Sequence, residues 1–240
     1  MYYFKPRPTR HFLTLFLAHE FAFPESSFDE EYHNKCTEFS RSNNLNYFIS
    51  SCFFLRLRPN GAIRINSTID DVKTYTTTNK FDSCSSGSQS GGSLYFESKG
   101  EFIQTKNSFI KSTNSNAGTS FSIQVSNKPN YKNHANETLV SNCGSSEQDC
   151  LLTTFMAYGF IIMNECNITQ NRVKKHNGGY RTTSITSDSY ITCVNVIENN
   201  QTSSGLNFHE TSLSYRSLIF KVTSCNYIRN KSPSGYLITF

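Results

Sequence analysis

The adjacent pair Asp70-Asp71, followed closely by Lys73, contains the residue types best suited to acid–base chemistry in this 240-residue chain. Two carboxylates held a few ångströms apart can divide the roles of general acid and general base. These three residues are therefore the candidate catalytic residues. Acidic pairs are also common on surface loops that have no catalytic role, and the chain has only six Asp in all. On balance the sequence favours a non-enzymatic function.

Residues 80–96, KFDSCSSGSQSGGSLYF, contain three glycines, of which Gly87 and Gly92 stand at the interval found in phosphate-binding loops. Ser93, however, stands where such a loop requires Lys, and an alternating strand pattern follows instead of a helix. The segment is therefore predicted to be a tight turn of the fold. We expect Phe81 and Cys84 to point into the core before the turn, and Leu94 and Phe96 to re-enter it afterwards.

The cysteines recur along the chain and predict a structural role. Six of the eight are expected at one place in a repeat, as a stack of small buried thiols, namely Cys52, Cys84, Cys143, Cys166, Cys193 and Cys225. Cys36 and Cys150 fall outside this register and are the candidates for a disulfide if the protein is secreted. No C-x-x-C motif occurs, so we expect no zinc site.

The six histidines are dispersed, without any pair at metal-ligand spacing. We therefore expect neither a metal nor a cofactor. His209 directly follows the predicted strand 206–208, and a solvent-facing side chain is expected there.

Internal repetition sets the architecture that must position these residues. Segments such as ECNITQN (165–171) and SCNYIRN (224–230) share a cysteine, one or two apolar residues and an asparagine, and a glycine followed by an alternating run comes after most of them. Ser112 takes the place of the cysteine in one copy. The units are 23–32 residues long. None could close a hydrophobic core alone, whereas stacked units could, so the sequence predicts a solenoid.

Composition supports a β structure for each unit. The chain has 25 Asn, 34 Ser and 23 Thr, which favour turns and are poor helix formers, together with 20 Phe and 13 Tyr. The frame φ-x-x-C … G-G-x-φ-x-φ, where φ is apolar, resembles the right-handed parallel β-helix of the pectin-lyase-like superfamily, and it is similar to repeat proteins predicted at the surface of protists. The resemblance implies an all-β, right-handed parallel β-helix. Enzymes of that superfamily are mostly polysaccharide lyases and glycoside hydrolases, but the Gly-His-Gly motif is missing here.

Two regions are expected. Residues 45–240 would form a β-helix of about seven coils, rising roughly 35 Å at ~4.8 Å per strand. Residues 1–44 would form an extension that either caps one end of the stack or contains a degenerate signal peptide, because the basic residues at positions 5, 7 and 10 precede a short apolar run. The alternating run at Phe240 has no cap after it, so the chain is either a piece of a longer protein or meets a partner there.

The charge and hydropathy pattern limits the partners. Net charge is +5 and thinly spread, and no cluster of basic and aromatic residues indicates nucleic-acid binding. No apolar run approaches the length of a membrane span. The sequence therefore predicts a secreted or cell-surface scaffold that presents Ser, Thr, Asn and Tyr to glycans or proteins, with a cytoplasmic location as the alternative. A carbohydrate-active enzyme and a purely structural segment remain the alternative functions, and the oligomeric state is open.

Overall fold

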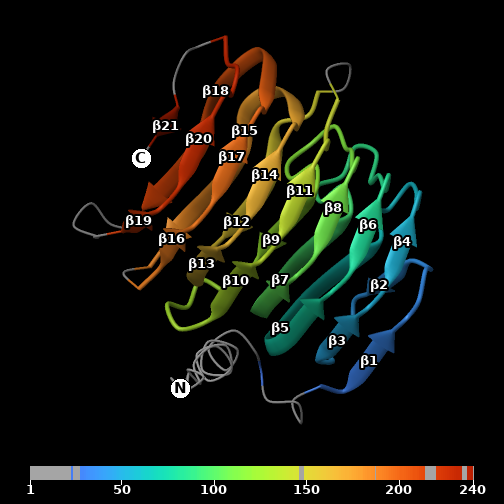
Figure 1. Ribbon diagram of the computed structural model, residues 1–240. Coiled ribbons are helices and arrows are strands. Elements are labelled where there is room, and N and C mark those ends of the chain that lie inside the picture. Colours follow the sequence, from blue (N-terminus) through green and yellow to red (C-terminus); the bar gives the residue numbers. More distant parts are fainter. Residues whose placement is uncertain are drawn as a thin grey trace, which may run out of the picture.

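The computed structural model describes residues 23, 28–145, 149–186, 188–213, 220–233 and 237–239. These form an all-β, parallel solenoid of about seven coils, as expected (Figure 1). Within the described ranges there is no helix long and apolar enough to cross a membrane. The basic and apolar N-terminal run (residues 5–18) and Gly235 lie outside the described residues.

Each coil contributes to three faces, which we number in chain order. Face 1 holds β1 (Glu30–His33), β3 (Tyr47–Ser50), the ends of β5 (Ile63–Thr77) and β7 (Leu94–Thr105), β10 (Lys132–Asn136), β13 (Phe160–Asn164), β16 (Tyr190–Thr192) and β19 (Lys221–Thr223). Face 2 is a separate sheet of seven three-residue strands: β4 (Phe53–Leu55), β6 (Lys80–Asp82), β8 (Ser108–Ile110), β11 (Leu139–Ser141), β14 (Asn167–Thr169), β17 (Asn195–Ile197) and β20 (Asn226–Ile228).

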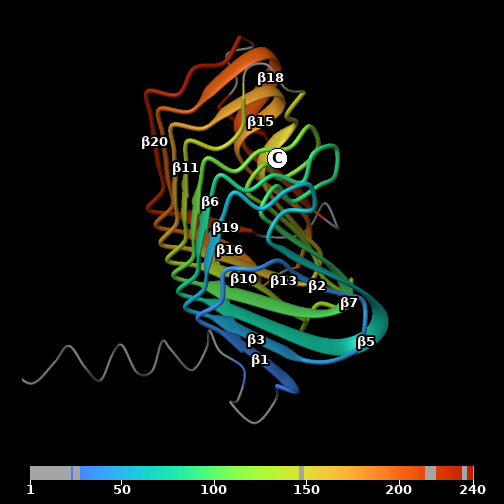
Figure 2. The ribbon, with the colours of Figure 1, turned by 90° about the vertical axis from the view of Figure 1, so that its right-hand side faces the viewer.

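Face 3 completes the coil. It holds β2 (Phe39–Arg41), the starts of β5 and β7, β9 (Phe121–Gln124), β12 (Leu152–Ala157), β15 (Arg172–Ile185), β18 (Asn200–Leu213) and β21 (Ile238–Thr239). β5 and β7 bend from face 3 into face 1, so these two faces join into one sheet. In Figure 2 the short strands β6, β11 and β20 lie one above another along one side of the stack.

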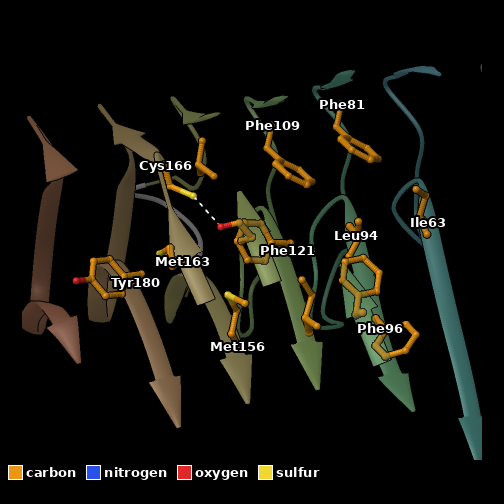
Figure 3. Close-up of a cluster of buried hydrophobic side chains, with 14 of the residues drawn as sticks. Ile63, Phe81, Leu94, Phe96, Phe109, Phe121, Met156, Met163, Cys166 and Tyr180 are labelled. Atoms are coloured by element: carbon orange, nitrogen blue, oxygen red, sulfur yellow. Dashed lines mark hydrogen bonds between the residues drawn. The ribbon is translucent and has the colours of Figure 1, made fainter. Parts of the chain in front are cut away.

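The core is built from ladders of equivalent residues one coil apart. On face 2 the middle residue of every strand points inward, and successive members are 27 to 31 residues apart: Phe54, Phe81, Phe109, Val140, Ile168, Val196 and Tyr227. The rings of Phe81 and Phe109 stack with centroids 4.5 Å apart. Phe109 also packs on Phe121 of face 3, and Figure 3 shows the two rings facing each other across the interior. Aromatic stacking and burial together stabilise the repeat.

Single residues with left-handed backbone make the two bends that flank face 2. The 1–2 corner, before each short strand, uses Ser51, Thr78, Lys106, Glu137, Glu165, Cys193 and Ser224. The 2–3 corner, after each short strand, uses Arg56, Ser83, Lys111, Asn142, Gln170, Glu198 and Arg229. None of these is glycine, although positive φ is unfavourable for residues with a Cβ. Each corner therefore sets a column of outward side chains, one per coil.

The segment 80–96 has the predicted orientation. Phe81, Cys84, Leu94 and Phe96 are all fully buried. Gly92 lies where two coils come close, because an added Cβ would come within 1.9 Å of the Thr119 carbonyl oxygen. The glycine allows this close approach of the backbones, and the segment is a turn between strands β6 and β7.

Residues 30–41 form β1 and β2 and pair in the same sheet as the later coils. Both strands lie within the extension predicted for residues 1–44. Residues 30–41 contain Cys36 but no glycine followed by an alternating run, and parallel pairing with β3 and β5 is what joins them to the stack.

The prediction that six cysteines share one place in the repeat is wrong. Cys52, Cys166 and Cys225 lie at the inner side of the 1–2 corner, whereas Cys84 and Cys143 lie at the inner side of the 2–3 corner. Cys193 occupies the left-handed position itself and is exposed. At both corners the residue that follows the left-handed position faces inward and can be cysteine, so the sequence motif does not distinguish the two corners.

Asparagines occupy five of the other inner corner positions. At the 1–2 corner, Asn79 and Asn107 follow Cys52, and the Cys52 N–H donates to Asn79 Oδ1 (2.9 Å). At the 2–3 corner, Asn171, Asn199 and Asn230 form a longer ladder in which each backbone N–H donates to the next amide oxygen at 2.9 Å. These amides replace hydrogen bonds that the bent backbone cannot make within the sheets.

Candidate ligand-binding groove

A polar groove of about 750 Å³ runs along the outside of the 2–3 corner. It spans the coils of β8, β11, β14, β17 and β20. Its lining comes from the left-handed column and from residues one or two positions further along the chain: Lys111, Asn142, Gly144, Gln170, Arg172, Glu198, Asn199, Asn200, Arg229 and Lys231. The groove is thus a direct consequence of the repeated corner.

The backbone places these side chains in two parallel rows. The first row is the left-handed column itself. In the second row, bridges connect Gly144 to Arg172 and Asn200 to Lys231, and Arg172 pairs with Asn200. Each row therefore has one residue per coil at the strand spacing of ~4.8 Å, although Gly144 adds no side chain to the second row.

Glu198 organises the centre of the groove. Its carboxylate accepts hydrogen bonds from Arg229 Nε (2.9 Å) and Gln170 Nε2 (3.1 Å), and it forms an ion pair with Arg229 Nη2 at 2.6 Å. The bond from Gln170 and the charge of Arg229 lower the pKa of Glu198. The three residues belong to three successive coils, so the contacts hold the side chains of the first row in line.

The other cations of the groove are available to a ligand. Lys111, Arg172 and Lys231 are exposed. In the described part of the chain, none of them takes part in an ion pair, whereas Lys174 and Lys175 nearby both pair with Asp149. Amides and cations beside one another can contact hydroxyl groups and negative charges on a polymer that follows the solenoid axis.

The structure places Asp70 and Asp71 far from this groove, where β5 bends from face 3 to face 1. Asp71 adopts a left-handed backbone, and the pairing of β5 with β7 shifts register on both sides of Asp70. Asp70 forms an ion pair with Lys128 Nζ at 3.3 Å, and Asp71 accepts a hydrogen bond from the Tyr131 hydroxyl. Both partners lie on the loop between β9 and β10.

Lys73 does not join this cluster. Its backbone N–H donates to Asn46 Oδ1 (2.7 Å), and its ammonium lies 5.8 Å from the centroid of the Phe23 ring. The hydrogen bond to Asp71 raises the pKa of Tyr131, which disfavours the phenolate form that a base would need. The contacts of Asp70 and Asp71 are those of a brace that ties the β9–β10 loop to β5.

His209, expected to face solvent, is fully buried. Its ring nitrogens lie 2.8 Å from the Tyr227 hydroxyl and 2.8 Å from Thr211 Oγ1, and Tyr180 lies 2.6 Å from the same Tyr227 hydroxyl. Burial lowers the pKa of His209 to about 4. The expectation failed because pairing shifts in β18 against β15 turn His209 inward.

No group of three or more His, Cys, Asp or Glu side chains within the described ranges could hold a metal ion. All eight cysteines are free, with Cys36 exposed and Cys150 buried, so these two are not paired. Burial raises the pKa of Cys143 and of Cys166 to about 12. These thiols are not activated nucleophiles.

Sequence reasoning missed the groove. Its residues are spread over 121 chain positions, from Lys111 to Lys231, and none belongs to a recognised motif. One signal was present: each short strand is followed at once by a polar or charged residue, and an inward-facing small residue comes next. Aligning the chain on that pattern would have placed the first row of the groove.

Comparisons with known proteins found no matching family model, no matching curated protein and no matching solved structure. The function must therefore be argued from the fold and the groove.

Proposed function

We propose that this chain is a non-enzymatic β-solenoid scaffold, secreted or at a cell surface, that binds an extended glycan in the groove of the 2–3 corner. One observation carries the proposal: polar and cationic side chains recur in two straight rows over five successive coils and line one continuous groove.

A linear polymer suits this geometry better than a compact ligand does. Each coil repeats the same corner backbone at ~4.8 Å, so a chain laid along the axis meets polar or charged groups of the groove at every step. The amides of Asn142 and Gln170 can both donate and accept hydrogen bonds, as sugar hydroxyls require. Many weak, repeated contacts then add up along the polymer.

A carbohydrate-active enzyme of the pectin-lyase-like superfamily is the second candidate. Its support is the sequence resemblance and the cluster of Asp70, Asp71, Lys128 and Tyr131. That cluster contains two carboxylates already engaged by Lys128 and Tyr131, and neither lies on the groove. A structural segment without a ligand of its own is the third candidate.

Binding of purified protein to an array of polysaccharides tests the proposal. We expect retention of a subset of glycans, and weakened retention when Asn142 and Gln170 are both changed to Ala. Asn195→Ala and Asn226→Ala on the outer surface of face 2 provide a matched control, because among the described residues the hydrogen bonds of these amides join them to each other and to Asn167. Equal loss in both double variants, or no bound glycan, would refute the groove as a glycan site.

The enzymatic alternative has its own test. Bound polysaccharides are incubated with the protein, and new reducing ends or unsaturated products are measured. Turnover that disappears in Asp70→Asn or Asp71→Asn would favour the enzyme, whereas binding without product favours the scaffold.

A further inference from the structure

The cations at the 2–3 corner follow a period of two coils. Coils are counted by the face 2 strands β4, β6, β8, β11, β14, β17 and β20, and the two rows give each coil two positions, of which Ser85 is buried. The odd coils carry Arg56 and Arg58 (coil 1), Lys111 (coil 3), Arg172 (coil 5), and Arg229 and Lys231 (coil 7). The even coils carry Ser83 and Ser85, Asn142 and Gly144, and Glu198 and Asn200.

The equivalence of these positions rests on backbone hydrogen bonds. In the first row, each N–H donates to the carbonyl that ends the next short strand, as Arg56 does to Asp82 (2.8 Å) and Lys111 does to Ser141 (3.1 Å). In the second row, the N–H of Ser85 donates to Leu57 O (2.9 Å), as that of Arg172 does to Cys143 O (2.8 Å). All six cations of the two rows therefore lie in odd coils.

Negative charge falls between them. Glu198 lies in coil 6, and Asp82, which directly precedes the first row, lies in coil 2. An anion opposite coil 2 or coil 6 would meet Asp82 or Glu198, one opposite coil 4 would meet only Asn142 and Gly144, and one opposite an odd coil would meet a cation. This alternation of charge favours a polymer whose negative charges are two coils apart and disfavours one with a negative charge at every coil.

The period has a physical length. Two coils at the strand spacing correspond to ~9.6 Å along the axis, which is close to the length of an extended disaccharide unit. Five of the six cations, all except Arg229, form no ion pair within the described ranges, so their charge is not neutralised by the protein.

We propose that the groove selects an anionic polysaccharide with one negative charge per disaccharide, laid along the solenoid axis with its charges opposite the odd coils. This inference rests on the proposed glycan-binding function and adds the class of ligand and its register.

The test compares four polymers of similar length: hyaluronan, which has one carboxylate per disaccharide; polygalacturonate, with one per sugar; neutral dextran; and single-stranded DNA. Affinity is measured by calorimetry or biolayer interferometry at two salt concentrations. We expect hyaluronan to bind most tightly. Its affinity should fall at the higher salt concentration, because exposed charges are screened.

Lys111→Gln and Lys106→Gln form a matched pair of variants. Both lysines are exposed, both have left-handed backbone, and they flank the same strand β8 at opposite corners. Only Lys111 lies in the groove. Lys111→Gln should weaken hyaluronan binding roughly fivefold, as expected for one charge pair in water, and Lys106→Gln should leave it unchanged.

Asn142→Lys tests the same two-coil spacing by adding a cation to an even coil instead of removing one from an odd coil. It places a cation in coil 4, at a corner position where lysine already occurs in coil 3. The ratio of the polygalacturonate affinity to the hyaluronan affinity should rise, because the new charge meets an anion that hyaluronan does not present.

The outcomes separate the two proposals. No binding of any glycan refutes the proposed function. Binding of dextran as tight as that of hyaluronan keeps the function but overturns the charge inference. Equal binding of hyaluronan, polygalacturonate and DNA, with equal effects of Lys111→Gln and Lys106→Gln, overturns the two-coil register in favour of unspecific attraction between charges.

Discussion

The two corners that flank face 2 share one backbone but differ in their side chains. Each uses one left-handed residue per coil and hides one small residue behind it. The 1–2 corner has Lys106 paired with Glu137 on its outer side, whereas the 2–3 corner presents a groove with unpaired cations. Backbone geometry therefore fixes where side chains stand, and their identity decides whether the column binds anything.

The inner sides differ as well. Coil 6 has Val194 behind the 1–2 corner and Asn199 behind the 2–3 corner, both fully buried. In coils 1 and 2 the 1–2 corner instead holds Cys52 followed by Asn79, with the amide bonded to the backbone. The corners are thus interchangeable in geometry, and four predictions test this comparison.

The largest effect is expected for Asn199→Val. Asn199 Oδ1 accepts from the N–H and the amide of Asn171 (2.9 Å each), and its own amide donates to Ile168 O (2.8 Å) and Asn230 Oδ1 (3.1 Å). Valine would leave several buried polar groups unpaired, so the free energy of unfolding should fall by about 4 kcal/mol. Urea denaturation measures this, with the exposed Asn195→Ala as control. A loss below about 1 kcal/mol would contradict the role of the ladder.

The second prediction concerns pH and the buried network of face 3. The pKa of His209 is about 4 in the folded protein and ~6.5 in an unfolded chain. The unfolded state therefore binds the proton more tightly, and the stability contributed by neutral His209 is complete above pH ~6.5 and is lost as the pH falls towards 4. The loss should be about 3 kcal/mol.

His209→Gln isolates this contribution, because glutamine can still contact Tyr227 and Thr211 but does not titrate. Denaturation at pH 7 and pH 4 should show a smaller difference for His209→Gln than for the unmodified chain. Equal differences would show that His209 is not the group that titrates.

The third prediction is that Val194→Asn is tolerated. Val194 follows Cys166 at the 1–2 corner just as Asn79 follows Cys52, where the amide accepts from the Cys52 N–H (2.9 Å) and donates to Ile49 O (3.0 Å). The new amide should find equivalent partners, so the free energy of unfolding should change by less than about 1 kcal/mol. A loss as large as that of Asn199→Val would mean that the two corners are not equivalent.

The fourth prediction, with the smallest expected effect, concerns the rates at which buried and exposed thiols react. Cys143 at the 2–3 corner and Cys166 at the 1–2 corner are both buried with a pKa of about 12, whereas Cys193 and Cys36 are exposed. Iodoacetamide at pH 8 should label Cys193 and Cys36 in the folded protein, and Cys143 and Cys166 only after unfolding. Mass spectrometry of the peptides reads this out. Fast labelling of either buried thiol would show that its corner opens.

Particular residues show how far sequence reasoning reached. Phe81, Cys84, Leu94 and Phe96 lie inward as predicted, because strict alternation next to a glycine-rich turn has one consistent arrangement. His209 was misplaced because the shifts of register in β18 break that alternation. The left-handed positions were not foreseen either, since Lys106, Glu198 and Arg229 are not the glycine or asparagine that usually signal such a backbone.

By itself, the sequence determined the class of fold: short alternating runs with Asn, Ser and Gly turns, repeated in units too small to bury a core, must stack. Only the tertiary structure decided which residues share a corner. Successive coils differ by 27 to 31 residues even along face 2, so chain spacing alone cannot align them. Hydrogen bonds between coils impose that alignment, and they bring Lys111, Arg172 and Lys231 into one groove while they leave Asp70 and Asp71 as a brace for a distant loop.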